Sequence, residues 1–173
     1  MSRIILDMIL DMRVNDEVCM DYKVLDVCVI NGRDTNLPKK AHNEDAGIDF
    51  FAPNDMEKVV LKPGEDTVIQ TGLRVAVPSG YALLGVNKSG VATKKKLVLG
   101  AKLIDCGYTG ELGIHLINVG TKETEINPGD KIAQFVLIPI GYSNVNIISE
   151  DEYMSGYGKS ERGEGGFGST GNA

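Results

Sequence analysis

The chain has 173 residues, of which 42% are hydrophobic, so it can bury one core, and we expect a single main domain. Its net charge of −6 and pI near 4.9 argue against nucleic-acid binding as a main role, since the sequence has no broad basic stretch to displace counterions from a phosphate backbone. The three cysteines, Cys19, Cys28 and Cys106, are odd in number and lack CxxC spacing, so they indicate neither a disulfide framework nor a zinc site.

Residues 1–20 are interpreted as an N-terminal extension of unknown role. Apolar side chains recur there at the spacing of an amphipathic helix, at Ile5, Met8, Ile9 and Met12. Asp7 and Asp11 interrupt the apolar residues, which makes this a poor signal peptide. No stretch of the chain approaches the roughly 20 apolar residues of a membrane span. We therefore expect a cytoplasmic protein that does not enter a membrane.

Between Tyr22 and Ile148 the sequence consists of short β-branched runs separated by turn residues, which predicts an antiparallel barrel or sandwich. The expected strands are Lys23–Ile30, Thr67–Gln70, Tyr81–Val86, Leu97–Ile104, Glu111–Ile117 and Lys131–Ile138. Tight reversals are expected at Pro63-Gly64, Pro78-Ser79-Gly80 and Pro128-Gly129, because proline presets φ for the first turn position and glycine accepts the positive φ that follows.

One short helix is expected over Ser89–Lys96. Ser89 is its predicted N-cap, and Lys94–Lys96 place positive charge at the end of the helix where the dipole favours it. The segment Asn87-Lys88-Ser89-Gly90 also puts a cation and a hydroxyl at the predicted helix start, where unpaired N–H groups favour a phosphate.

The segment Leu99–Gly110 is interpreted as a β-hairpin, with Asp105 at the end of an apolar strand and Tyr108 three residues later. Asp and Gly at a turn usually mean only a turn. The functional interpretation is that Asp105, ionised at neutral pH, activates a water molecule while Tyr108 presents a flat ring to a sugar.

Two further polar residues are ambiguous. Asp49, in Ala46–Asp49, follows a glycine in a strand-like context, and most such aspartates are simply solvated. Gln134 follows the turn at Gly129 into an apolar strand, and is either an edge residue or a phosphate donor.

The C-terminal segment Arg162–Gly171 has two interpretations. Its composition is that of a flexible glycine-rich linker. However, it also contains a cation able to bind phosphate, an aromatic ring able to stack on a base, and two adjacent hydroxyls, at Arg162, Phe167, Ser169 and Thr170. Glycines between them let backbone N–H groups approach an anion closely. This combination favours a nucleotide-binding lid.

Read in order, these five segments resemble the five motifs of the trimeric dUTPase family, and the match spans Leu37–Gly171. The resemblance implies an all-β fold, a distorted jelly-roll β-barrel over residues 21–157 with one short helix, followed by a flexible C-terminal arm, the lid at residues 158–173. It also implies a homotrimer with shared active sites that hydrolyses dUTP to dUMP and pyrophosphate. This reaction limits uracil incorporation into DNA and supplies dUMP for dTTP synthesis.

By the same resemblance, Asp105 is the general base and Tyr108 packs under the deoxyribose. Uracil is read by backbone groups around Leu99–Ile104, and Phe167 stacks on it when the lid closes. The full set of substrate-binding positions that the resemblance implies is Lys88, Ser89, Gly90, Gly100, Leu103, Ile104, Tyr108, Gln134, Arg162, Phe167, Gly168, Ser169 and Thr170. Among them Ser89 and Gln134 resemble phosphate-chain donors.

The implied cofactor is Mg2+, held chiefly by the substrate phosphates, as suits this strongly hydrated ion. Asp49 matches a motif carboxylate that meets the metal through water only. Three positions depart from the family pattern. Lys88 stands where the family has arginine and cannot supply a planar two-pronged contact, Lys102 replaces a frequent glycine, and Gly107 replaces a second acid.

Two alternatives differ in class. A dCTP deaminase shares the fold but needs an acid–base residue beside the pyrimidine, and the Leu99–Gly110 segment offers no convincing glutamate for it. The other alternative is a regulatory module that binds dUTP and signals through a partner with little turnover. Product analysis separates the first alternative from the dUTPase interpretation, and measured hydrolysis separates the second.

Overall fold

The computed structural model describes residues 23–160 and 163. The chain divides into two compact units, Met1–Ile140 and Gly141–Ala173, which are described separately. The predicted extension at residues 1–20 lies outside the described residues. The predicted lid, residues 158–173, lies within the second unit, and most of it is also outside the described residues.

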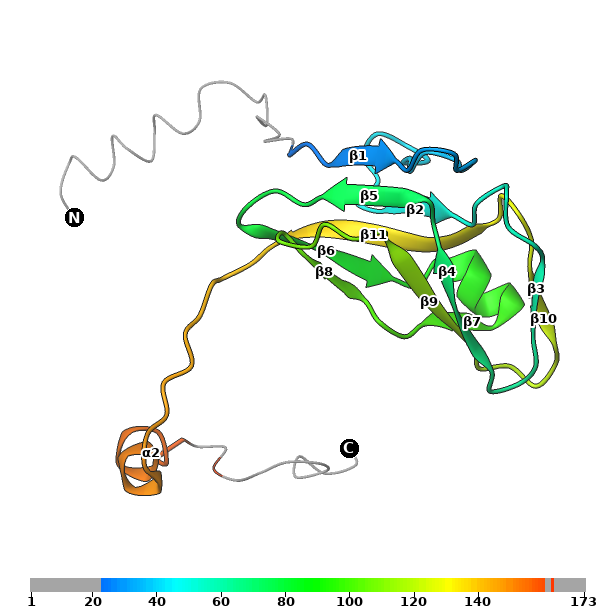
Figure 1. The fold of residues 1–173 in the computed structure, drawn as a ribbon. Coiled ribbons are helices and arrows are strands. Elements are labelled where there is room, and N and C mark those ends of the chain that lie inside the picture. The colour runs from blue at the N-terminus through cyan, green and yellow to red at the C-terminus, as the bar shows by residue number, and fades with distance from the viewer. Residues whose placement is uncertain (1–22, 161–162, 164–173) are drawn as a thin grey trace. The chain divides into compact units, whose positions relative to one another are not determined.

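The described part of the first unit is built of antiparallel strands, as predicted (Figure 1). The strands are β1 (Asp26–Val29), β2 (Ile48–Phe51), β3 (Val59–Leu61), β4 (Asp66–Gln70), β5 (Leu73–Ala76), β6 (Tyr81–Val86), β7 (Leu97–Leu99), β8 (Leu103–Asp105), β9 (Gly113–Asn118), β10 (Thr124–Ile126) and β11 (Lys131–Pro139). They form a four-stranded sheet in the order β2-β11-β6-β8, a three-stranded sheet β4-β9-β7, and the pairs β1-β5 and β10-β3.

The core lies between the sheets, because successive side chains of a strand alternate between its two faces. In β9 the alternation is strict: Ile114, Leu116 and Asn118 are buried, and Gly113, His115 and Ile117 are half-buried. Phe50 of β2 and Phe135 of β11 meet edge to face, with ring centroids 4.9 Å apart. Other fully buried side chains are Leu73, Leu83, Leu97, Leu112 and Ile126.

The predicted turns are confirmed, since Gly64, Gly80 and Gly129 all have φ between 76° and 83°. The prediction of one continuous strand over Leu97–Ile104 is wrong. The chain leaves one sheet after β7, which pairs with β9, and joins the other as β8, which pairs with β6. The crossover is held by hydrogen bonds from Gly100 N–H to the His115 carbonyl and from Gly85 N–H to the Lys102 carbonyl.

The predicted hairpin over Leu99–Gly110 is therefore also wrong in its pairing. A reversal does occur, with the Tyr108 N–H donating to the Asp105 carbonyl at 3.1 Å. The chain after the turn bonds elsewhere, because the Leu112 N–H donates to the Leu73 carbonyl. Single-strand periodicity does not reveal which strand will be the partner.

The predicted helix is present as the short π-helix η1 (Val91–Lys95), with Lys94 and Lys95 in its last turn. Ser89 as the N-cap is wrong, because Gly90 occupies that position and no side chain caps the helix. The Lys88 carbonyl already accepts from the Ala92 N–H. Ser89 consequently carries an exposed side chain beside the first turn.

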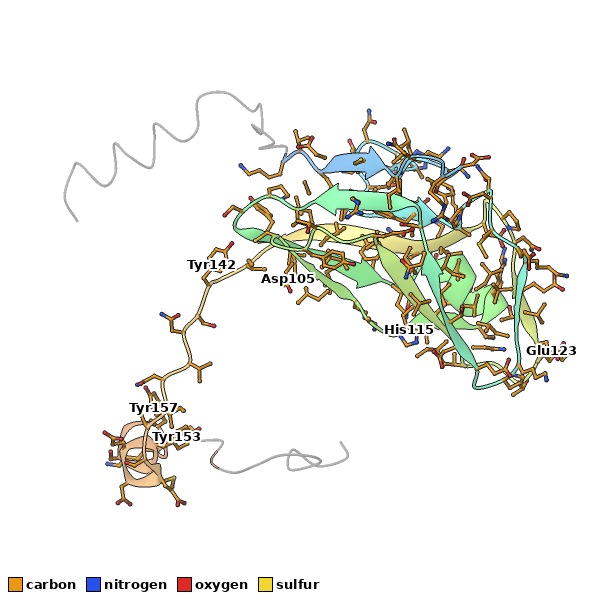
Figure 2. All side chains as sticks on the ribbon, in the orientation of Figure 1. Asp105, His115, Glu123, Tyr142, Tyr153 and Tyr157 are labelled. Carbon is orange, nitrogen blue, oxygen red and sulfur yellow. The ribbon has the colours of Figure 1, made fainter. Side chains whose placement is uncertain are left out.

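The second unit contains α2 (Glu150–Gly156), which sequence reasoning missed. Its signal was present as Ser149-Glu-Asp-Glu152, a capping box in which the Ser149 hydroxyl accepts from the Glu152 N–H and the Glu152 carboxylate accepts from the Ser149 N–H. Tyr153 and Tyr157 lie on one side of this helix with ring centroids 5.5 Å apart (Figure 2). None of the helices in the described residues has the length and apolar character that crossing a membrane requires.

An ion pair ties η1 to the turn before β11. Lys95 Nζ donates to Asp130 Oδ2 at 2.6 Å and to the Glu125 carbonyl at 3.0 Å. Burial raises the pKa of the Asp130 carboxyl, but Lys95 and the Asn127 N–H outweigh it and hold that pKa below its ordinary value. The pair therefore stabilises the fold above the unfolded-state pKa, and this contribution is lost as the pH falls through the lower folded-state pKa.

We expect Lys95→Met to lower Tm at pH 7 by about 2–4 °C, which corresponds to roughly 1 kcal/mol for a partly exposed pair. The difference from wild type should shrink below about pH 4. Thermal unfolding followed by circular dichroism at both pH values measures this. Lys58→Met, which removes an exposed pair with Glu125, is the matched control and should change Tm by less. Equal shifts for the two variants would contradict the assignment.

Candidate functional site

A cavity of about 310 Å³ lies against β8 and the turn that follows it. Four of its lining residues are predicted site residues: Leu103, Ile104, Asp105 and Tyr108. The others, Val68, Gln70, Glu111 and Gly113, come from β4, β9 and the segment before β9, and sequence reasoning did not identify them. The cavity thus brings the predicted base, the predicted sugar platform and the predicted uracil-reading strand together.

Asp105 is the last residue of β8, opposite Ala82 of β6, and its side chain is exposed (Figure 2). β8 is the edge strand of the four-stranded sheet. An edge strand presents N–H and C=O groups that no neighbouring strand pairs. The backbone around Leu103 and Ile104 can therefore hydrogen-bond a ligand in the cavity, next to the Asp105 carboxylate.

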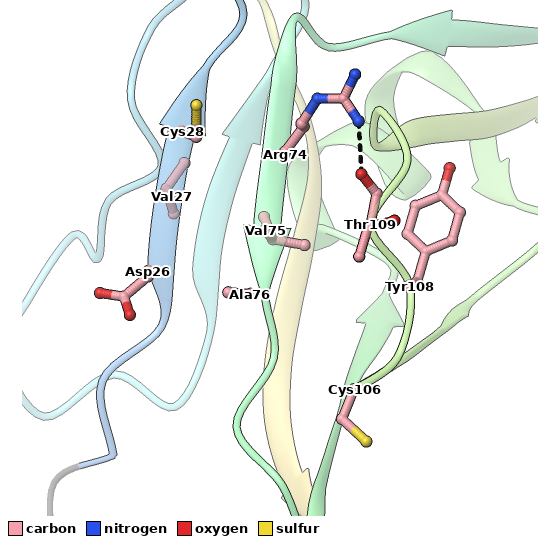
Figure 3. A pocket seen from close by; sticks show the side chains of 9 residues that line it. All are labelled: Asp26, Val27, Cys28, Arg74, Val75, Ala76, Cys106, Tyr108 and Thr109. Carbon is pink, nitrogen blue, oxygen red and sulfur yellow. Dashed lines mark hydrogen bonds between the residues drawn. The ribbon is translucent and has the colours of Figure 1, made fainter.

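The turn after Asp105 is held on both sides. Tyr108 Oη donates to the Glu111 carbonyl at 2.7 Å, and Arg74 Nη1 of β5 donates to the Thr109 carbonyl at 2.6 Å (Figure 3). Tyr108 is 43% exposed and lines the cavity, so a ligand there can reach it. A site preorganised in this way loses little entropy when it binds.

On its other side the same turn borders an apolar groove of about 320 Å³, which is lined by residues of the paired strands β1 and β5 (Figure 3). Val27 and Val75 line it together with Tyr108, and so do the two cysteines Cys28 and Cys106. The Tyr108 turn therefore separates two hollows of different character.

Glu111 lines the cavity, and two hydrogen bonds hold its carboxylate in place. Its Oε1 accepts from Arg33 Nη1 at 2.9 Å and from the Gly72 N–H at 2.8 Å. Arg33 is fixed in turn by Asp55, with Nε to Oδ2 at 2.8 Å, and this hydrogen bond raises the pKa of the Arg33 guanidinium above its ordinary value. The three residues are far apart in sequence, and no local pattern linked them.

A second group of predicted residues lies at the other end of the four-stranded sheet. Asp49 of β2 is 3% exposed. Lys88 Nζ donates to its Oδ1 at 2.8 Å, and Lys131 Nζ forms an ion pair with its Oδ2 at 2.9 Å. Burial raises the pKa of the Asp49 carboxyl, but the two lysines together outweigh it and hold that pKa below its ordinary value. Asp49 is therefore charged at neutral pH.

Among the described residues, no group of three His, Cys, Asp or Glu side chains is arranged to hold a metal ion. Asp49 Oδ2 is buried and accepts no hydrogen bond of good geometry from the described residues, so it retains acceptor capacity for a water molecule. The Asp49 Oδ2 atom therefore fits a magnesium ion that is met through a water molecule.

Gln134 of β11 pairs with Asp49 on one side and with Val86 of β6 on the other. Its side-chain amide lies directly over Gly47, where a Cβ atom would fall 1.6 Å from Nε2. The missing side chain at Gly47 thus leaves the space that the Gln134 amide occupies. Ser89 and Gly90 follow Lys88 and are exposed, whereas Gly100 is half-buried in the crossover before β8.

Within one chain, Asp105 and the Asp49–Gln134 group lie far apart. Gln134 is opposite Val86, and Asp105 is opposite Ala82, at the far end of the same strand β6. Along β6, the four residues from Ala82 to Val86 span about 13 Å. Across the sheet, β11 and β8 are two strands apart, at about 5 Å per strand. The described part of a single chain therefore does not place Asp105 beside the Asp49–Gln134 group. The predicted lid residues Arg162, Phe167, Gly168, Ser169 and Thr170 lie outside the described residues.

Comparison with known proteins identifies the family. A family model described as dUTPase matches residues 33–171. Deoxyuridine 5'-triphosphate nucleotidohydrolase of Burkholderia mallei is 40% identical over 155 residues, which are 88% of this chain and 97% of that protein. The corresponding protein of Burkholderia ambifaria is 39% identical over the same length.

Solved structures agree. Staphylococcus bacteriophage 80alpha dUTPase with dUpNHpp superposes with a TM-score of 0.73 at 32% identity, covering 87% of this chain and all of that one. A mutant dUTPase of phage phi11 of S. aureus, with a structural Mg(II) ion, gives a TM-score of 0.64 at 32% identity, covering 75% of this chain and 99% of that one. The shared architecture defines the class, a jelly-roll-type all-β nucleotide hydrolase. The chain belongs to the dUTPase family, as the resemblance of its motifs predicted.

We expect Gly47→Ala to displace the Gln134 amide and raise the Kd for the dUTP analogue dUpNHpp several-fold, about 3- to 10-fold. The atoms that a Cβ would meet belong to the end of a flexible side chain, so they can move, and Tm should change little. Calorimetric titration and thermal unfolding measure the two effects. Gly141→Ala is the control, because a Cβ there meets nothing within 4 Å. Unchanged affinity in Gly47→Ala would show that Gln134 does not bind the phosphates.

Proposed function

We propose that this chain hydrolyses dUTP to dUMP and pyrophosphate, with Asp105 as the general base. The observation that carries the proposal is the Asp105 carboxylate at the end of an edge strand, in one cavity with Tyr108 and with the backbone of Leu103 and Ile104. Membership of the dUTPase family supports the same substrate and the same bond.

In the proposed reaction Asp105 accepts a proton from a water molecule, whose oxygen forms a bond to the α-phosphorus. The bond from that phosphorus to the bridging oxygen of the β-phosphate breaks, and pyrophosphate leaves with the electron pair. A carboxylate suits this role because it is ionised at neutral pH and acts at hydrogen-bond distance.

The neighbouring residues position the substrate. Uracil lies against the edge-strand backbone at Leu103 and Ile104, and the Tyr108 ring packs under the deoxyribose. Ser89 and Gln134 donate to the phosphate chain, Lys88 adds positive charge, and bound Mg2+ neutralises charge on the phosphates. In the lid, Phe167 stacks on the base, while Arg162, Ser169 and Thr170 contact the terminal phosphate.

We further propose that the active site is shared between the chains of a homotrimer. The separation of Asp105 from the Asp49–Gln134 group within one chain supports this. A general base and the donors that bind the same phosphate must all lie within a few ångströms of it. A second chain that supplies its own Gln134 and Ser89 to the first chain's Asp105 satisfies that requirement.

A panel of dUTP, dTTP, dCTP and UTP, with pyrophosphate detection, tests the reaction. Wild type should release pyrophosphate from dUTP in strong preference to the others. Asp105→Asn should keep affinity for dUpNHpp and lose about 10²- to 10⁴-fold in kcat, because an amide cannot take the proton. Ammonia from dCTP would identify a deaminase instead. Binding of dUTP without turnover by wild type would identify a regulatory module.

Subunit mixing tests the shared site. Asp105→Asn and Gln134→Ala chains, each inactive alone, are unfolded together at equal concentration and refolded. If the two residues come from different chains, about a quarter of the sites in random trimers combine both wild-type residues, and about a quarter of the wild-type rate returns. Chains refolded separately and then combined are the control. A mixture as inactive as its components would show that one chain supplies both residues.

A further inference from the structure

A β-bulge determines where Lys131 points. Lys131 pairs with Phe51 and Ala133 pairs with Phe50, so Ile132 is an extra residue in β11. Side chains alternate between faces, and without the extra residue Lys131, three positions before Gln134, would point to the opposite face. The bulge places Lys131 on the face that carries Asp49, Phe51 and Gln134.

The side chain of Lys131 is held there by two contacts. Its Nζ is 2.9 Å from Asp49 Oδ2 and 5.8 Å from the centroid of the Phe51 ring, close enough for a cation–π interaction. Asp49 is 4% exposed at its side chain, and Lys131 is 38% exposed. A surface lysine therefore reaches inward to a buried carboxylate.

Two ammonium groups pair with the Asp49 carboxylate, one with each oxygen. Lys88 takes Oδ1 and Lys131 takes Oδ2. An arginine fork binds both oxygens of a carboxylate at once, whereas a lysine is a compact charge that binds one. Lys88 alone would leave the second oxygen of a buried carboxylate without a cation.

We propose that Lys131 is a positioning residue, which completes with Lys88 a two-lysine clamp on Asp49 and so sets the Lys88–Ser89 segment for the phosphate chain. The proposal rests on the proposed function. Asp49 is the cross-strand partner of Gln134, and Lys88 immediately precedes Ser89, so the clamp connects the two phosphate donors through one carboxylate. Lys131 acts through Asp49 and does not itself contact the substrate.

The test is rescue by a bidentate cation. Lys131→Met should raise the Kd for dUpNHpp about tenfold, because the Asp49 carboxylate and the Lys88–Ser89 segment lose one of their two anchors. The double variant Lys131→Met with Lys88→Arg should return to within about twofold of wild type, since arginine binds both Asp49 oxygens. Lys88→Arg alone is measured as the reference for the double variant.

The exposed Lys58→Met is the matched control for loss of one positive charge. Gel filtration and circular dichroism establish that each variant is folded, and Lys131→Gln replaces Lys131→Met if the latter folds poorly. A Kd unchanged from wild type, or a fall in Tm alone, would overturn the proposal. Failure of Lys88→Arg to rescue would also overturn it, because a bidentate cation on Asp49 would then not replace Lys131. These titrations use an analogue that is not hydrolysed, so they remain informative even if wild type fails to turn over dUTP.

Discussion

The register of β11 against its two neighbours is the constraint on which the site depends. Side chains alternate along a strand, and a shift of one residue reverses every side chain that follows. Phe135 enters the core beside Phe50, and Gln134 therefore faces the opposite way, between Asp49 and Val86. The bulge at Ile132 then adds Lys131 to the same face. Hydrophobic packing on one side of the sheet thus orients the charged and amide groups on the other.

The same sheet separates binding functions by position. Its edge strand β8 offers unpaired backbone groups and Asp105, whereas β2 and β11 offer buried charge and an amide. A flat base suits the first setting, because backbone donors and acceptors on a rigid edge strand can hydrogen-bond the polar edge of the base. A triphosphate suits the second setting, because two lysines surround the single Asp49 carboxylate there and leave a net positive charge. Because a sheet is stiff, the two ends cannot approach each other within one chain, and the proposed site therefore requires residues from a second chain.

Sequence reasoning succeeded where a signal is local. The glycine turns at Gly64 and Gly129 and the strand content follow from short patterns, and the order of the motifs identified the family. It failed where the outcome depends on partners. Three features join residues distant in sequence: the strand pairing after Gly100, the Arg33–Glu111 contact and the Lys131–Asp49 contact. The capping box at Ser149 is different, because its signal was local and was overlooked.

The substitution at Lys88 illustrates why a single position is a poor unit of interpretation. Viewed alone, it replaces a planar two-pronged cation by a point charge, a change that would weaken the site. In the folded chain a second lysine, from the bulged start of β11, reaches the other oxygen of the same carboxylate. Two lysines also bring two charges where one arginine brings one. In a chain with a net charge of −6, that surplus concentrates positive potential beside Ser89 and Gln134, the surface proposed to meet a triphosphate.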